Sequence, residues 1–345
     1  MSSPTAAEAA SGTSETERAD GAVPDEPGRG RHATKPSEVP AKGWKDVGLR
    51  VVKEMQEDNV PLAAAGVAFY GFLAAVPALA ALVSIYGLFA TPRQVGSRVN
   101  DLFGALPEDA RRLLSNQLKA IAGGSSAGLS LTAAVGILLS LWSASSGMAH
   151  LMQAVNLAYG EKHTRKFLKQ RAMALGLTVG SLVVVIAAVT AMTVFPAALG
   201  ATSLPTPLRA LLNVAGWLVL ALLFVVGLSV LFRYSPERDE PKWRWVTPGA
   251  LVGLALWVTA SVLFQVYAAN FSSYNKTYGA LAGVVLLLMW LFLSGLAVLV
   301  AAEINAELEH QTQQDTTTGP PQPLGERNAE MADTVGPSAD ALKHH

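Results

Sequence analysis

The sequence predicts an all-α, polytopic membrane protein with six transmembrane helices, a short amphipathic helix before the first span and a helical hairpin in the first outer loop. Between Asp58 and Glu303 lie six stretches without Asp, Glu, Lys or Arg, which run for 34, 41, 37, 23, 31 and 26 residues. A hydrocarbon core about 30 Å thick needs about 20 helical residues, so each stretch can cross it. The composition agrees, because 51% of the residues are hydrophobic and only 15% are charged.

The six spans are placed within the uncharged stretches. Only helices satisfy their own backbone hydrogen bonds within lipid, so each stretch is expected to be helical. Pro77 is expected to kink the first helix. The expected spans are residues 62–88, 129–151, 175–195, 211–231, 246–268 and 280–302.

The chain is expected to form one membrane domain over residues 42–309 with a disordered tail on each side. Residues 1–41 are rich in Ser, Thr, Pro, Gly, Ala and Glu, and residues 310–345 have a similar polar composition around Gly319-Pro320-Pro321. Such segments bury too little apolar surface to offset the entropy of ordering.

Before the first span, apolar residues recur at helical spacing at Trp44, Val47, Val51 and Met55. With Lys45, Arg50 and Lys53 on the other faces, the pattern favours a helix that lies in the membrane interface, with Trp44 at headgroup depth and the lysines toward anionic lipid. The alternative is a solvated segment that leads into the first span.

The first loop is expected to fold as two helices. Thr91-Pro92 is typical of a helix start, Pro107-Glu108-Asp109 of a second start, and Gly123-Gly124 of its end. This hairpin either caps the outer mouth of the bundle or simply packs on the lipid headgroups.

The basic residues predict the orientation, because short positive loops stay in the cytoplasm. The loops after the second and fourth spans carry five and four basic residues, while those after the third and fifth hold one basic residue each near the membrane, Arg209 and Lys276. Both termini are therefore expected in the cytoplasm of a plasma or inner-membrane protein. The first loop, of mixed charge, disagrees with this assignment. The basic residues of the two cytoplasmic loops are Lys162, Arg165, Lys166, Lys169, Arg171, Arg233, Arg238, Lys242 and Arg244.

The second span carries a stripe of small and polar residues on one face: Ser140, Ser143, Gly147, His150 and Ala154. One interpretation is close helix packing, in which small residues let two backbones approach. The other is the polar lining of a substrate path. The remaining candidate polar residues at depth are Gln265, Tyr267, Glu303 and Asn305.

Three GxxxG pairs are expected to be packing faces. They are Gly176/Gly180, Gly249/Gly253 and Gly279/Gly283.

Many separated motifs, in order, resemble the YihY/BrkB family of bacterial inner-membrane proteins over about residues 42–309. They are Ala68-Phe69-Tyr70, Pro77, Leu141-Trp142-Ser143, Asn156, Tyr159, Arg165, Arg233-Tyr234-Ser235-Pro236, Trp243-Arg244-Trp245-Val246-Thr247-Pro248-Gly249-Ala250, Phe264, Tyr267, Tyr274, Tyr278-Gly279-Ala280-Leu281-Ala282, Trp290-Leu291 and Ala302-Glu303-Ile304-Asn305-Ala306. The resemblance implies the fold and the location. It also implies a weak link to lipid-precursor export or serum resistance, and members have carried the label ribonuclease BN.

The sequence argues against enzyme chemistry. Metal-dependent RNA hydrolysis needs clustered carboxylates or histidines, and the six histidines are scattered. There is no cysteine, no Walker A loop, no G-x-S-x-G and no H-E-x-x-H. We therefore expect no catalytic residues, no cofactor, no metal and no nucleic-acid partner.

Two functions remain. The first is a transporter or flippase-like exporter of an envelope lipid or another amphipathic molecule, supported by the polar stripe and the capping hairpin. The second is a non-transporting membrane scaffold or envelope-integrity protein, favoured because so few ionisable residues lie deep in the bilayer. Membrane lipids are expected partners in both.

Overall fold

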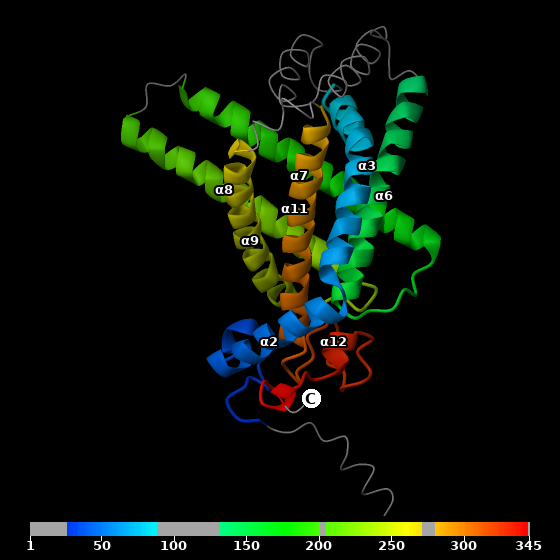
Figure 1. Cartoon of the computed structure of the whole chain (residues 1–345), viewed down its shortest axis with the longest axis vertical. Coiled ribbons are helices and arrows are strands. Elements are labelled where there is room, and N and C mark those ends of the chain that lie inside the picture. The colour runs from blue at the N-terminus through cyan, green and yellow to red at the C-terminus, as the bar shows by residue number, and fades with distance from the viewer. Residues whose placement is uncertain (1–25, 88–130, 201–204, 271–279, 344–345) are drawn as a thin grey trace, which may run out of the picture.

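The computed structural model (Figure 1) describes residues 26–87, 131–200, 205–270 and 280–343. Within these ranges the structure contains six helices long and apolar enough to cross a membrane and no β-strand, which confirms the predicted fold class. They are α3 (Val60–Gly87), α6 (Leu131–Ala158), α7 (Phe167–Gly200), α8 (Thr206–Tyr234), α9 (Trp243–Asn270) and α11 (Ala280–Glu309).

Each of the six helices passes at least one of its expected limits, and the residues added to α7 and α11 include charged ones. α7 begins at Phe167, so Lys169 and Arg171 belong to its first turns. α11 continues to Glu309, which places Glu303 and Asn305 inside a helix rather than at its end. Charge-free runs locate the part of a helix within hydrocarbon, but they do not mark where the helix ends. The expected hairpin at 91–124 lies outside the described residues.

α11 lies at the centre of the bundle. It packs on α9 at one side and on α3 and α6 at the other, and the ring is completed by α7 and α8, which are strongly inclined to α11 (Figure 1). Consequently α6 and α9, the second and fifth spans, lie on opposite sides of α11.

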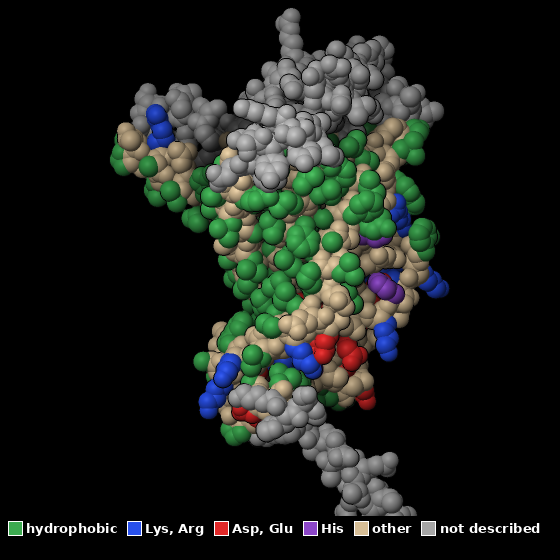
Figure 2. All heavy atoms as spheres, viewed as in Figure 1, with side chains coloured by type: hydrophobic (Ala, Val, Ile, Leu, Met, Phe, Trp, Pro, Cys, Tyr) green, Lys and Arg blue, Asp and Glu red, His purple; other side chains and the backbone are tan. Residues whose placement is uncertain are grey.

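The most buried part of the bundle lies near the end where α2 crosses it. Small residues dominate there, including Ala64, Ala250 and Ala302, which are fully buried. Hydrophobic side chains cover the flank seen in Figure 2, and acidic side chains gather at the α2 end. An apolar flank is the surface expected of a protein whose solvent is lipid.

Of the GxxxG pairs, only Gly249/Gly253 is confirmed as a packing face within the chain. A Cβ atom at Gly249 would lie 2.3 Å from the carbonyl oxygen of Ala301, so α9 and α11 meet closely. Gly176 and Gly180 have open space at the same position, and packing of this pair within the chain was a wrong prediction. Gly279 lies outside the described residues.

α2 (Ala41–Glu57) confirms the amphipathic helix, but part of the expected arrangement is wrong. Val47 and Val51 pack on Trp245 and Leu308 rather than on lipid. Arg50, which the pattern places off the apolar face, is only 2% exposed. The physical reason is a buried partner on α11, described below. The outer face still presents Trp44, Leu49 and Val52 beside Lys45 and Lys53.

The expectation of disordered tails does not hold for residues 26–41 and 310–343. These segments pack together against α2 and the end of α11, and they include η1 (Pro36–Glu38), α12 (Glu330–Asp333) and η3 (Ala341–Lys343). Gln311, Thr312 and Thr316 are fully buried.

Hydrogen bonds, rather than a hydrophobic core, hold these segments in place. The Arg327 guanidinium, for example, donates hydrogen bonds to the carbonyl oxygens of Gln313, Gln322 and Ala332. Composition therefore underestimated their order, because it counts apolar residues and not the hydrogen bonds that tertiary contacts supply. Residues 1–25 lie outside the described residues.

Candidate functional site

A column of charged and polar residues lies between α2 and α11. α11 carries Glu303 and Glu307, followed by Gln311 at the same spacing of four residues. α2 carries Arg50 and Glu54, followed by Asp58 at the same spacing. Residues four apart share one face of a helix, and the two helices pack on each other. We call these six residues the charged column.

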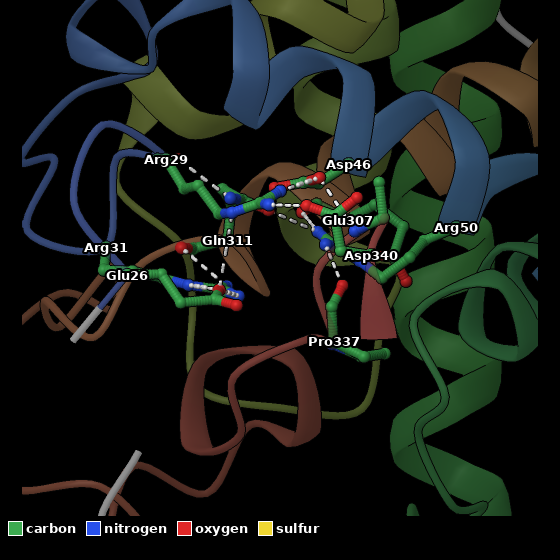
Figure 3. A network of polar contacts seen from close by, with 10 residues as sticks. Glu26, Arg29, Arg31, Asp46, Arg50, Glu307, Gln311, Pro337 and Asp340 are labelled. Atoms are coloured by element: carbon green, nitrogen blue, oxygen red, sulfur yellow. Dashed lines mark hydrogen bonds and ion pairs between the residues drawn. The ribbon is translucent and has the colours of Figure 1, made fainter. Parts of the chain in front are cut away.

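At the end of the column nearest the terminal segments, Arg50 donates hydrogen bonds to the other polar groups (Figure 3). Its Nε donates to Glu307 Oε2, and its Nη2 donates to the carbonyl oxygen of Glu307 at 3.0 Å and to Gln311 Oε1 at 2.8 Å. Its Nη1 donates to the carbonyl oxygen of Pro337 at 3.0 Å. Each nitrogen of this buried guanidinium thus has a partner, which is what a buried ion pair requires to be stable.

The network continues into the two terminal segments (Figure 3). Asp46 accepts hydrogen bonds from Arg29 Nη1 at 2.7 Å and from the backbone N–H of Ala339 at 2.9 Å. Gln311 Nε2 donates to the carbonyl oxygen of Arg29 at 2.9 Å. The hydrogen bond to Asp46 raises the pKa of Arg29 above its usual range. Both ends of the described chain are therefore fastened to α2 and α11 by charge.

The inner end of the column contains Glu303, whose carboxylate has no such partner. Glu303 is 0% exposed, and neither of its carboxyl oxygens accepts a hydrogen bond from any residue that the structure describes. The charged groups that act on it are other carboxylates, those of Asp58, Glu307 and Glu54. Tyr159, which is also buried, is the other titratable group near it.

Burial and neighbouring negative charge also raise the pKa of the two carboxylates just outside the span, Glu54 and Asp58. Burial, followed by the negative charges of Glu307 and Glu57, raises the pKa of Glu54 above its usual range. Burial, followed by the charge of Glu57, raises the pKa of Asp58. The inner end therefore holds an excess of carboxylates and favours the binding of positive charge.

Asn305, a sequence candidate next to this column, links α11 to α9. Its Oδ1 accepts from the backbone N–H of Gly249 at 2.7 Å, and its Nδ2 donates to the carbonyl oxygen of Val246 at 3.0 Å. These bonds flank Pro248, which has no N–H to donate. All of the side chain's amide is engaged with backbone, so Asn305 fastens two helices together.

The other candidates are dispersed. On α6, Ser143 is exposed and Ser140 is half-buried, while the His150 ring stacks on Tyr70 of α3 with centroids 3.5 Å apart. On α9, beyond α11, Gln265 and Tyr267 are exposed. The structure brings His150 against α3 and does not bring the α6 and α9 residues together.

Sequence reasoning missed Arg50, Glu54 and Asp58 as members of a site. Their spacing of four residues in a helix was a signal, but it became informative only when the matching spacing on α11 was placed opposite. No group of three or more His, Asp or Glu residues able to hold a metal ion occurs within the described ranges.

Comparison with known proteins gives the following similarities. A family model described as virulence factor BrkB matches residues 51–325. A putative ribonuclease-like protein of Bacillus subtilis, YfkH, is 31% identical over 181 residues, which cover 50% of this chain and 64% of the relative. A UPF0761 membrane protein of Tolumonas auensis is 37% identical over 25% of this chain and 28% of its own length.

A UPF0761 membrane protein of Vibrio cholerae is 34% identical over 38% of this chain and 48% of its own length. The matches thus span less than two thirds of each of these relatives. No solved structure matches the chain.

Proposed function

Because the chain belongs to the virulence factor BrkB family of membrane proteins, we propose that it moves an amphipathic molecule of the cell envelope, such as a lipid, across the membrane. The proposal includes Glu303 as the group that takes up and releases a proton during transport. The observation that carries it is the isolation of the Glu303 carboxyl group, which is fully buried in a membrane helix and has no hydrogen-bond donor within the described residues.

A buried charge without a partner is strongly destabilising, so such a residue is retained where it has a function. The groups around Glu303 support proton binding. α2 contributes Glu54 and Arg50, and the Arg50 guanidinium is already paired with Glu307. The other two groups are Asp58, just before α3, and Tyr159, just after α6. The nearest free charges are therefore negative, and an incoming proton relieves their repulsion.

The second candidate function is a non-transporting scaffold. The separation of α6 from α9 favours it, because the residues expected to line a path face different sides of α11. The two functions differ in one measurable respect, since only a transporter moves a lipid between leaflets.

We infer that the α2 end of the bundle faces the cytoplasm, since the basic loops after α6 and α8 lie there. The chain has no cysteine, so single cysteines report the side directly. In intact cells, Lys162→Cys is expected to react only with membrane-permeant thiol reagents and Thr206→Cys, at the opposite end, with impermeant ones. Both positions are exposed. The reverse reactivity would overturn the orientation.

The transport proposal is tested in proteoliposomes with fluorescent phosphatidylglycerol in one leaflet. The full-length protein is expected to move this probe faster than protein-free vesicles do, and faster still under a transmembrane pH gradient. Glu303→Gln preserves the shape of the side chain but cannot release a proton, so it is expected to abolish the response to the gradient while thermal stability in detergent is kept.

The matched control is Glu57→Gln, which removes an exposed carboxylate from α2. It is expected to behave as the unaltered protein. Lipid movement no faster than in protein-free vesicles would contradict transport of this probe and favour the scaffold. An unchanged gradient response in Glu303→Gln would remove Glu303 from the mechanism.

A further inference from the structure

A pocket of about 380 Å³ lies where the start of α7 meets the connection between α8 and α9 and the C-terminal segment. Four cationic residues line it: Arg165, Lys166, Lys169 and Arg238. Figure 2 shows Lys, Arg and His side chains along the edge of the molecule where α7 begins. The pocket lies apart from the charged column and shares none of its residues.

Two carboxylates, those of Asp239 and Glu237, also line the wall. Asp239 Oδ1 accepts a hydrogen bond from Asn328 Nδ2 at 3.4 Å, whereas Glu237 is held by backbone N–H groups. Glu237 Oε2 accepts hydrogen bonds from the backbone N–H groups of Thr164 at 2.6 Å and Arg165 at 2.5 Å, immediately before α7. It therefore fills the position that an anion would take at the start of a helix. Any further anion must be held by the side-chain cations.

Two of these cations have unused capacity. Lys166 and Lys169 are exposed and form no ion pair within the described residues. The Arg238 side chain is 0% exposed and is paired with Glu309, to which its Nη2 donates. The Arg165 guanidinium is bonded to the carbonyl oxygens of Ser235 and Pro236. The wall thus offers two free ammonium groups.

The surroundings of the pocket place it at a membrane boundary. Phe167 and Leu168 lie between the two lysines in sequence and are 71% and 76% exposed. One helical turn further along α7, the Arg171 guanidinium lies 4.4 Å from the centre of the Trp142 ring and donates to Ser146 Oγ at 3.2 Å. The candidate span begins at Phe167. Exposed apolar residues beside cations and Trp are typical of headgroup depth.

We propose that this pocket binds the phosphate group of an anionic membrane lipid, with Lys166 and Lys169 as its principal contacts and the acyl chains along Phe167 and Leu168. A free phosphate ion offers the same charge but has no acyl chain to bury. Lipid binding in this pocket does not require transport, so it is tested independently of the role proposed for Glu303.

The test uses the full-length protein in a neutral detergent. Thermal stability is measured with added phosphatidylglycerol, phosphatidylcholine or inorganic phosphate at equal concentration. Phosphatidylglycerol is expected to raise the melting temperature, and the other two are expected to have little effect. The Lys166→Ala/Lys169→Ala variant is expected to need about 30-fold more phosphatidylglycerol for the same rise. Each cation near an anionic lipid surface contributes about 1 kcal/mol, and the loss of two such cations corresponds to about 30-fold in affinity.

Lys162→Ala is the matched control, since Lys162 is exposed in the same connection but does not line the pocket. It is expected to respond as the unaltered protein does. Both lysines of the double variant are exposed, so its melting temperature without lipid is expected to be unchanged. An equal response of the double variant and the control would overturn the site. A response to inorganic phosphate as large as that to phosphatidylglycerol would overturn the assignment to lipid.

Discussion

Replacement of Arg50 by alanine is expected to lower the free energy of unfolding by about 3–5 kcal/mol, because it leaves the Glu307 carboxylate buried without its partner. Glu307 is fully buried, and Arg50 also bonds Gln311 and the carbonyl oxygen of Pro337. The variant therefore loosens the C-terminal segment as well as the contact between α2 and α11. The measurement is thermal or denaturant unfolding in detergent, together with limited proteolysis of residues 310–343.

Two companion variants separate charge from general damage. Lys53→Ala removes an exposed cation from the same helix, whose pair with Glu57 is on the surface, and it is expected to change stability by less than about 1 kcal/mol. In Arg50→Met/Glu307→Gln both charges are absent, so much of the lost stability is expected to return. If Arg50→Ala were no less stable than Lys53→Ala, the buried ion pair would not be what holds this end together.

Replacement of Gly249 by alanine is expected to cost about 2–4 kcal/mol. The added Cβ atom would lie 2.3 Å from the carbonyl oxygen of Ala301 and 2.5 Å from Oδ1 of Asn305, so α9 and α11 must move apart. Overpacking of this kind costs about 1–3 kcal/mol, and the two hydrogen bonds of Asn305 add about 0.6 kcal/mol each. Thermal unfolding in detergent measures the loss.

Gly180 is the internal control for this prediction. A Cβ atom there meets no heavy atom within 4 Å, so Gly180→Ala is expected to be neutral or slightly stabilising. Equal stability of Gly249→Ala and Gly180→Ala would show that the close approach of α9 and α11 does not exist in the folded protein.

The candidate residues show which features of a membrane protein a sequence pattern predicts and which it does not. The stripe that includes Ser143 and His150 was correctly seen as one face of a helix, but a pattern cannot say which neighbour that face meets. It meets α3 at Gly147, where a Cβ would lie 2.7 Å from the Cβ of Ala74. Gln265 was a further candidate at depth, yet α11 lies between α6 and α9. Glu303 was a candidate by its depth alone until its surroundings were known.

The sequence by itself determined the fold class and the place of all six spans, because lipid imposes a local rule: about 20 uncharged residues in one helix. Local composition is sufficient to apply that rule. Only the tertiary structure decided which charges meet. Arg50 and Glu307 are 257 residues apart, and their pairing depends on the turns at which α2 and α11 cross. The same crossing leaves Glu303 without a donor and gives the polar terminal segments the partners that order them, since the cost of burying a charge depends on its neighbours and not on its position in the chain.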